Sequence, residues 1–348
     1  MNINTDLLKE IVETPGIPGH ETEIRKVIKR EVEPLVDEFR IDNIGNIIAI
    51  KKGKKDKKLA SAAHMDEIGL IVKHIDDNGF LRFHNLGGFD PKTLVSQRVT
   101  VHGSKDLPGV LGTKPIHVMK PEERKKMPEL TDFYIDLGLP KEEVEKYISV
   151  GDSVSRFSDL QEMGNTFNAK SLDNRICVYV LIEALKAIKK PAYDFYAVFS
   201  CQEEVGIRGA SVAAHSINPD FSIALDTTVA NDGPTNGGHD KVTELGKGAA
   251  VKIMDSSAIC DKRMVNFLKE TALKNKIEHQ LEILTAGGTD TSGLQRMGKD
   301  GSIAGAISVP TRYLHQTIET CHKEDIKASV TLLQKAAESV GKHNWEHE

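Results

Sequence analysis

The chain has 348 residues, of which 39% are hydrophobic, and a formal net charge of -5 at pH 7. This length predicts two domains or one large domain with an insertion, and the absence of a basic surplus argues against nucleic acid or an anionic membrane as a partner. No apolar run approaches the ~20 residues of a membrane span, and residues 1–6 lack the basic and apolar regions of an export signal, so we expect a cytoplasmic protein.

The first 66 residues predict the beginning of an α/β domain. Helices are expected over 5–13, with Thr5 as the N-cap, and over 21–35, where apolar residues recur on one face. Three strands are expected over 36–41, 46–51 and 59–63, with the charged run 51–58 forming a solvated turn. The third strand is apolar and delivers His64 and Asp66 at its carboxyl end.

Residues 67–162 have the pattern of a separate all-β unit. Segments 68–74 and 80–83 flank an Asp-Asp-Asn-Gly turn, which predicts a hairpin. Short strands follow at 98–102 and 110–113, separated by glycine and proline turns. We therefore predict a small β domain, 67–162, inserted into a discontinuous domain made of residues 1–66 and 163–348.

Helices and strands alternate again after the insertion. The predicted elements are helices over 176–188, 262–275 and 324–340, and strands over 195–201, 222–225, 278–284 and 302–308. This alternation predicts an α/β fold with a mostly parallel sheet sandwiched by helices. In such sheets ligands gather at the carboxyl ends of the strands.

Polar residues occur at these strand ends and just before the 176–188 helix. They are His64, Asp66, Asp173, Glu203, Glu204, Asp226 and His315. Each alone has an ordinary structural explanation, such as a helix N-cap for Asp173. Together, two histidines and several carboxylates without a thiolate favour Zn²⁺ or a similar divalent ion, and one shared carboxylate can bridge two ions ~3.5–4 Å apart.

These residues lie within motifs that resemble a known family. The motifs are His64-Met65-Asp66-Glu67, Ser171-Leu172-Asp173-Asn174-Arg175, Gln202-Glu203-Glu204-Val205-Gly206, Ala224-Leu225-Asp226 and Tyr313-Leu314-His315. Their ordered set resembles the TET-type dinuclear metal aminopeptidases, relatives of glutamyl and deblocking aminopeptidases, some of which are labelled endoglucanases. The resemblance covers essentially the whole chain and implies a zinc-peptidase-like catalytic domain.

The resemblance also implies a role for each site residue. Asp173 would bridge two metal ions, His64 and Asp226 would complete one ion, and Glu204 and His315 the other. Glu203 would be the general base and then the general acid, and Asp66 would orient His64. The substrate-lining loop would be Gly287, Gly288, Thr289 and Asp290. The ions would be Zn²⁺, or alternatively Co²⁺ or Mn²⁺.

The implied activity is removal of N-terminal residues from peptides with a free N-terminus by a metal-activated water. The inserted domain would mediate dimerisation, and the dimers would assemble into a hollow dodecamer. This chain departs from the family pattern at Gln316-Thr317, where Ser-Pro is common, and at Thr291, where alanine is common.

Three other functions compete with this interpretation. A dinuclear deacylase or carboxypeptidase-type amidohydrolase could use the same ligand types. An endoglucanase needs two carboxyl groups flanking one glycosidic bond, which leaves the two histidines unexplained. A catalytically silent scaffold would not need to keep every metal ligand.

Overall fold

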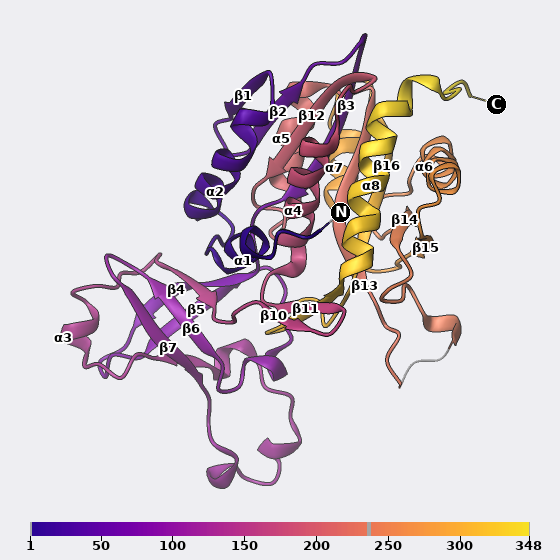
Figure 1. The fold of residues 1–348 in the computed structure, drawn as a ribbon. Coiled ribbons are helices and arrows are strands. Elements are labelled where there is room, and N and C mark those ends of the chain that lie inside the picture. The colour runs from indigo at the N-terminus through magenta and orange to yellow at the C-terminus, as the bar shows by residue number, and fades with distance from the viewer. Residues whose placement is uncertain (1, 235–237, 348) are drawn as a thin grey trace.

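Eleven strands form one large sheet within residues 2–234 and 238–347, the part of the chain that the computed structural model describes (Figure 1). Residues 1 and 348, the outer limits of the predicted catalytic domain, lie outside this part. Nine strands follow one another in the order β1 (Glu38–Ile41), β2 (Ile47–Lys51), β12 (Tyr193–Ser200), β3 (Lys55–His64), β13 (Phe221–Val229), β16 (Ile303–Arg312), β17 (Glu319–His322), β11 (Thr166–Ala169) and β10 (Gln161–Met163). The other two are β14 (Ala249–Met254), which pairs with β16, and β15 (His279–Ile283), which pairs with β14.

The strand directions make this sheet mixed, so the predicted mostly parallel sheet is not confirmed. In this row only the central strands β12, β3, β13 and β16 run parallel to one another, while the pairs on either side of them are antiparallel. Short turns explain the edges, because a connection of a few residues reverses the chain: β1 joins β2, and β10 joins β11, in this way.

The register of the central strands aligns their carboxyl ends. His64 of β3 lies opposite Ser200 of β12, and Ala62 lies opposite Ala224 of β13. β3 begins at Lys55, so the predicted charged turn is partly strand; Lys55 and Lys57 are exposed, and Lys58 is half-buried. β13 continues to Val229, four residues beyond the predicted end, which places Asp226 inside the strand rather than after it.

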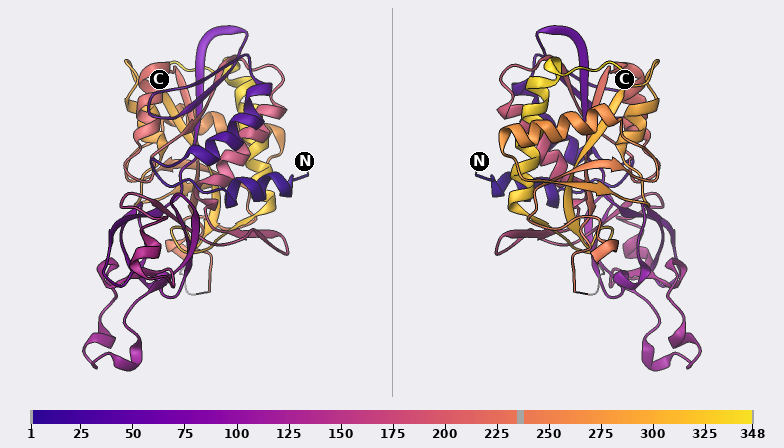
Figure 2. Two further views of the ribbon diagram at one scale, coloured as in Figure 1. Left: turned by 90° about the vertical axis from the view of Figure 1, so that its left-hand side faces the viewer. Right: turned by 90° about the vertical axis from the view of Figure 1, so that its right-hand side faces the viewer.

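Helices cover both faces of the sheet (Figure 2). One face carries α1 (Thr5–Glu13), α2 (Thr22–Val32), α4 (Leu172–Ala187), α6 (Lys262–Asn275) and α8 (Lys323–Ser339). The other carries α5 (Arg208–Ile217) and α7 (Asp290–Arg296). α4 is the most deeply buried helix because it packs against the sheet and against α1, α2 and α8. The predicted N-cap of α1 is wrong: Asn4, not Thr5, accepts the Leu7 amide hydrogen bond.

The inserted segment folds as a closed barrel beside the sheet (Figure 1). Its strands, in order around the barrel, are β4 (Gly69–Ile75), β5 (Leu81–Leu86), β8 (Tyr134–Asp136), β7 (Asp106–Gly112), β6 (Arg98–His102) and β9 (Ser153–Arg156). β4 and β5 form the predicted hairpin, a short helix α3 (Lys141–Val144) follows β8, and the barrel has its own apolar core. Residues 113–133, between β7 and β8, form an arm that projects from the barrel (Figure 2).

The four cysteines, Cys177, Cys201, Cys260 and Cys321, are all buried free thiols. Burial raises the pKa of Cys201 and that of Cys260 to about 12. Within the described residues, none of the helices combines the length and apolar character needed to cross a membrane.

Candidate metal centre

His64 and Asp173 form the middle of a cluster at the carboxyl ends of the parallel strands. His64 is the last residue of β3, and its side chain is 1% exposed. Its Nε2 atom lies 3.4 Å from Asp173 Oδ1 and 3.8 Å from both Glu203 Oε2 and Asp226 Oδ1. His64, Asp173 and Asp226 therefore present ligand atoms close enough together to hold one metal ion.

His315 approaches the same aspartate from the opposite side. Its Nε2 atom lies 3.4 Å from Asp173 Oδ2 and 3.6 Å from Glu204 Oε2, so these three residues form a second candidate group. The two oxygens of Asp173 thus face two different histidines. This is the arrangement required of a carboxylate shared between two ions.

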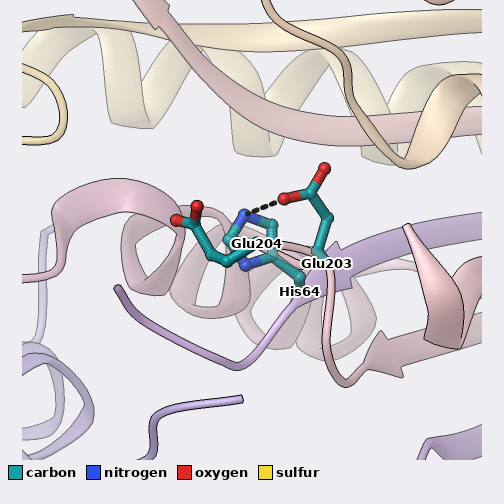
Figure 3. A group of neighbouring side chains, drawn as sticks. All are labelled: His64, Glu203 and Glu204. Atoms are coloured by element: carbon teal, nitrogen blue, oxygen red, sulfur yellow. Dashed lines mark ion pairs between the residues drawn. The ribbon is translucent and has the colours of Figure 1, made fainter. Parts of the chain in front are cut away.

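The carboxylate of Asp66 fixes the backbone of Glu203 and Glu204. Its two carboxylate oxygens accept the backbone N–H groups of Glu203, at 3.0 Å, and Glu204, at 3.1 Å. Figure 3 shows the two glutamate side chains reaching different positions around His64, with an ion pair between His64 and Glu203. His64 Nδ1 lies closer to the Asp66 backbone oxygen, at 3.1 Å, than to its carboxylate, at 3.6 Å.

The side chains of the cluster carry more negative charge than the two imidazoles can balance. Burial raises the pKa of Glu204 to about 7, with His315 opposing the shift and Asp173 adding to it. Burial also raises the pKa of Glu203 and that of Asp226 well above their usual range. Burial would raise the pKa of Asp173 too, but hydrogen bonds from both histidines lower it.

Burial acts on the pKa of the two histidines in the opposite direction. Burial lowers the pKa of His315, but the nearby Glu204 and Asp173 carboxylates outweigh it and raise the pKa to about 10. The buried Oε1 atom of Glu204 has no hydrogen-bond partner among the described residues. Divalent cations fit this site because they would neutralise the carboxylates and take the place of protons on the imidazoles.

A cavity of about 500 Å³ opens over the cluster. Gly287, Gly288 and Thr289 of the predicted substrate loop line it, together with the apolar side chains of Ile207, Val229, Leu284, Ala286 and Leu314. Asp290 is buried behind the loop, where Ser200 Oγ donates to its carboxylate. Burial raises the pKa of Asp290 to about 6, against the opposing effect of His64 and Ser200.

Sequence reasoning missed buried charges that support the site. Glu319 of β17 accepts the Asp173 backbone N–H at 2.8 Å, and Glu67 accepts hydrogen bonds from Lys170 at 2.7 and 2.8 Å. On the other side, Lys252 is fully buried and lies 3.1 Å from both Asp255 and Glu282. The local signals were the adjacency of Glu67 to Asp66 and the three-residue spacing of Lys252 and Asp255, because the other pairs are formed by the fold.

Comparison with known proteins gives a consistent result. A profile of the M42 glutamyl aminopeptidase family matches residues 45–332. A putative aminopeptidase of Acetivibrio thermocellus is 42% identical over 332 residues, which are 95% of this chain and 97% of the relative.

Two solved structures share the fold. An aminopeptidase of the archaeon Desulfurococcus kamchatkensis superposes with a TM-score of 0.92 at 37% identity, covering 96% of this chain and 94% of that one. The TET1 peptidase of Pyrococcus horikoshii, described as able to assemble into a tetrahedron or a large octahedral shell, superposes with a TM-score of 0.85 at 33% identity, covering 96% and 98%. The resemblance to TET aminopeptidases is thereby confirmed, and this chain belongs to the M42 glutamyl aminopeptidase family of peptidases.

Proposed function

We propose that the chain is an aminopeptidase that uses two divalent metal ions. The observation that carries this proposal is the position of Asp173, whose Oδ1 and Oδ2 atoms each lie 3.4 Å from a different histidine. Asp173 would bridge the ions, His64 and Asp226 would complete one position, and Glu204 and His315 the other. Zn²⁺ is the first candidate because imidazole and carboxylate ligands suit it, with Co²⁺ and Mn²⁺ as alternatives.

Glu203 is the proposed general base. When bound, the two ions would acidify a shared water and polarise the scissile carbonyl. Glu203 lines the cavity beside both ligand groups, and its raised pKa, which burial causes, suits a carboxylate that accepts a proton and then donates it to the leaving amine. Asp66 acts as a positioning residue, because its carboxylate fixes the backbone of Glu203 and Glu204.

The cavity above the cluster is the proposed binding site for the N-terminal residue of the peptide. Its wall combines the Gly287–Thr289 loop with apolar side chains, so it offers room for a side chain next to the reacting carbonyl. Asp290, the last residue of the predicted loop, is buried and accepts a hydrogen bond from Ser200 Oγ. A requirement for a free α-amine separates an aminopeptidase from a deacylase or carboxypeptidase-type enzyme.

The domain division and the assembly are parts of the same proposal. Residues 1–66 and 163–348 would form the catalytic domain, and 67–162 a dimerisation domain whose dimers build a hollow dodecamer. The arm supports this role, because Ile116, Val118 and Met127 are 59–63% exposed on it. Apolar side chains exposed together are typical of surfaces that bind other chains.

The test is hydrolysis of a panel of aminoacyl chromogenic substrates, each paired with its N-acetylated form. The panel is measured before chelation, after chelation and after metal is restored. We expect metal-dependent cleavage of the free-amine set alone, and the ranking of substrates would define the preferred N-terminal residue.

Two outcomes would contradict the proposal. Cleavage of the acetylated set would favour a deacylase. Hydrolysis of a β-glucan that survives chelation would favour a metal-independent endoglucanase.

A further inference from the structure

His315 is the most exposed of the proposed metal ligands. Its side chain is 43% exposed, compared with 1% for His64. It lies between β16 and β17, where the backbone adopts left-handed conformations at Tyr313 (φ 64°) and at His315 itself (φ 58°). Burial within the catalytic domain therefore does not fix this imidazole, and other contacts must orient it.

Those contacts come from the inserted barrel. The Gly88 carbonyl, just after β5, accepts a hydrogen bond from His315 Nδ1 at 3.1 Å. Thr317 Oγ1 donates to the Thr93 carbonyl at 2.9 Å, and Arg156 at the end of β9 donates to the carbonyl of Gln316. At Gln316 and Thr317 this chain differs from the Ser-Pro that is common in the family. Both residues contact the inserted barrel, so the difference lies at the interface between the barrel and the rest of the chain.

The hydrogen bond to Gly88 determines which ring nitrogen is free. With Nδ1–H donated to that carbonyl, Nε2 is the atom that faces Asp173 and Glu204, at 3.4 and 3.6 Å. A backbone carbonyl that fixes a histidine in this way sets both its orientation and its tautomer for metal binding.

The fit between barrel and imidazole is close at Gly88. A Cβ atom added there would lie 3.1 Å from His315 Nδ1, closer than an ordinary van der Waals contact. A Cβ atom at the preceding Gly87 would lie 3.2 Å from Glu204 Oε2, so the same turn also approaches the second ligand of this position. The other position lacks this dependence, since His64 is fixed by β3 and by the backbone oxygen of Asp66.

We propose that the inserted barrel positions His315 through Gly88 and the Thr317–Thr93 hydrogen bond, and so sets the affinity of the ion held by Asp173, Glu204 and His315. The affinity of the ion held by His64 and Asp226 would not depend on the barrel. This inference rests on the proposed two-ion site but not on the nature of the substrate.

The experiment measures Co²⁺ binding by equilibrium dialysis and visible absorption for the full chain and four variants. Gly88→Ala presses a methyl group toward His315, and Thr317→Val removes the hydroxyl donor at nearly constant volume. The matched controls are Gly233→Ala, where an added Cβ would meet nothing within 4 Å, and Thr317→Ser, which keeps the donor.

We expect one of the two Co²⁺ ions to bind about 10-fold or more weakly in Gly88→Ala and Thr317→Val, with the other ion and the folded state unchanged by circular dichroism. Both controls should bind like the wild type. Two unchanged affinities in both test variants would overturn this inference alone. A wild-type chain that binds no ion would overturn the proposed function as well, and equal weakening of both ions would show that the barrel does not act selectively.

Discussion

At the scale of single residues, the site depends on carboxylates with different tasks. Glu203 and Glu204 are neighbours, yet Glu204 shares His315 with Asp173 while Glu203 approaches His64. Asp66 makes this divergence possible by accepting both of their backbone N–H groups. It was expected to orient His64, and the geometry gives its carboxylate a second task.

Glu203→Gln should abolish turnover while leaving both metal ions bound. The amide cannot accept the proton of the attacking water, and a general base is worth roughly 10²–10⁴-fold in rate. Metal analysis of the purified variant and its kcat check the expectation.

Glu204→Gln is the matched comparison, because it changes the adjacent residue and should lose one ion as well as activity. Loss of metal in Glu203→Gln, or near-normal kcat, would contradict the role assigned to Glu203.

Among the secondary-structure elements, β14 and β15 connect a buried cluster of charged side chains to the wall of the cavity. Lys252 of β14 lies between Asp255 and Glu282, the latter on β15. Asp255 accepts a hydrogen bond from Thr289, and Glu282 accepts one from Thr228, both at 2.8 Å. Thr228 and Thr289 line the cavity. The proposed substrate loop is therefore held at Thr289 by a cluster of buried charged side chains.

Lys252→Met should destabilise the fold and weaken substrate binding. It leaves two buried carboxylates without their cation, which costs about 3–5 kcal/mol. Burial lowers the pKa of Lys252, but Glu282 and Asp255 outweigh it and raise the pKa. The stabilisation is therefore complete at neutral pH and is lost only as the pH rises above the ordinary lysine range.

Denaturant unfolding and KM measure these two effects of Lys252→Met. Lys274→Met, at an exposed position on α6, is the control and should change neither. An unchanged unfolding midpoint in Lys252→Met would show that the cluster contributes little.

The sequence predicts the strands that carry the site better than the contacts that support it. Phe195–Cys201 and Leu59–Ala63 are apolar runs with polar residues at one end, so their position and direction could be read directly. β14 and β17 were missed, because Ala249–Met254 begins with small residues and Glu319–His322 is only four residues long. Glu319 contacts Asp173, which is 146 residues away along the chain, and Lys252 contacts Glu282 on another strand as well as the nearby Asp255. The two distant contacts follow from the fold, and no local pattern encodes them.

At the scale of the whole molecule, the barrel and the sheet domain meet at the active-site edge. Arg156 shows this most directly, since it belongs to a barrel strand and lies 3.8 Å from Glu319 and 3.9 Å from Glu67, two acids beneath the site. A change in how the barrel packs against the sheet would therefore shift Glu319, which accepts the backbone N–H of Asp173.

The assembly proposal predicts a particle of about 460 kDa, twelve copies of the 38.3-kDa chain. Mass photometry at nanomolar concentration would resolve it from a dimer or a monomer, and dilution would report its stability. A species that remains monomeric at all concentrations would contradict the dodecamer and leave the exposed apolar residues of the arm to be explained.

The four buried thiols can be used to measure local opening of the structure. A thiol reacts with an alkylating reagent only as an accessible thiolate. Burial makes all four cysteines inaccessible and raises the pKa of each thiol, so that little thiolate is present. Covalent labelling therefore requires the surrounding structure to open. Cys201 lies two residues before Glu203, whereas Cys321 lies in β17, so their separate labelling rates would distinguish opening of the catalytic edge from opening of the neighbouring strand pair.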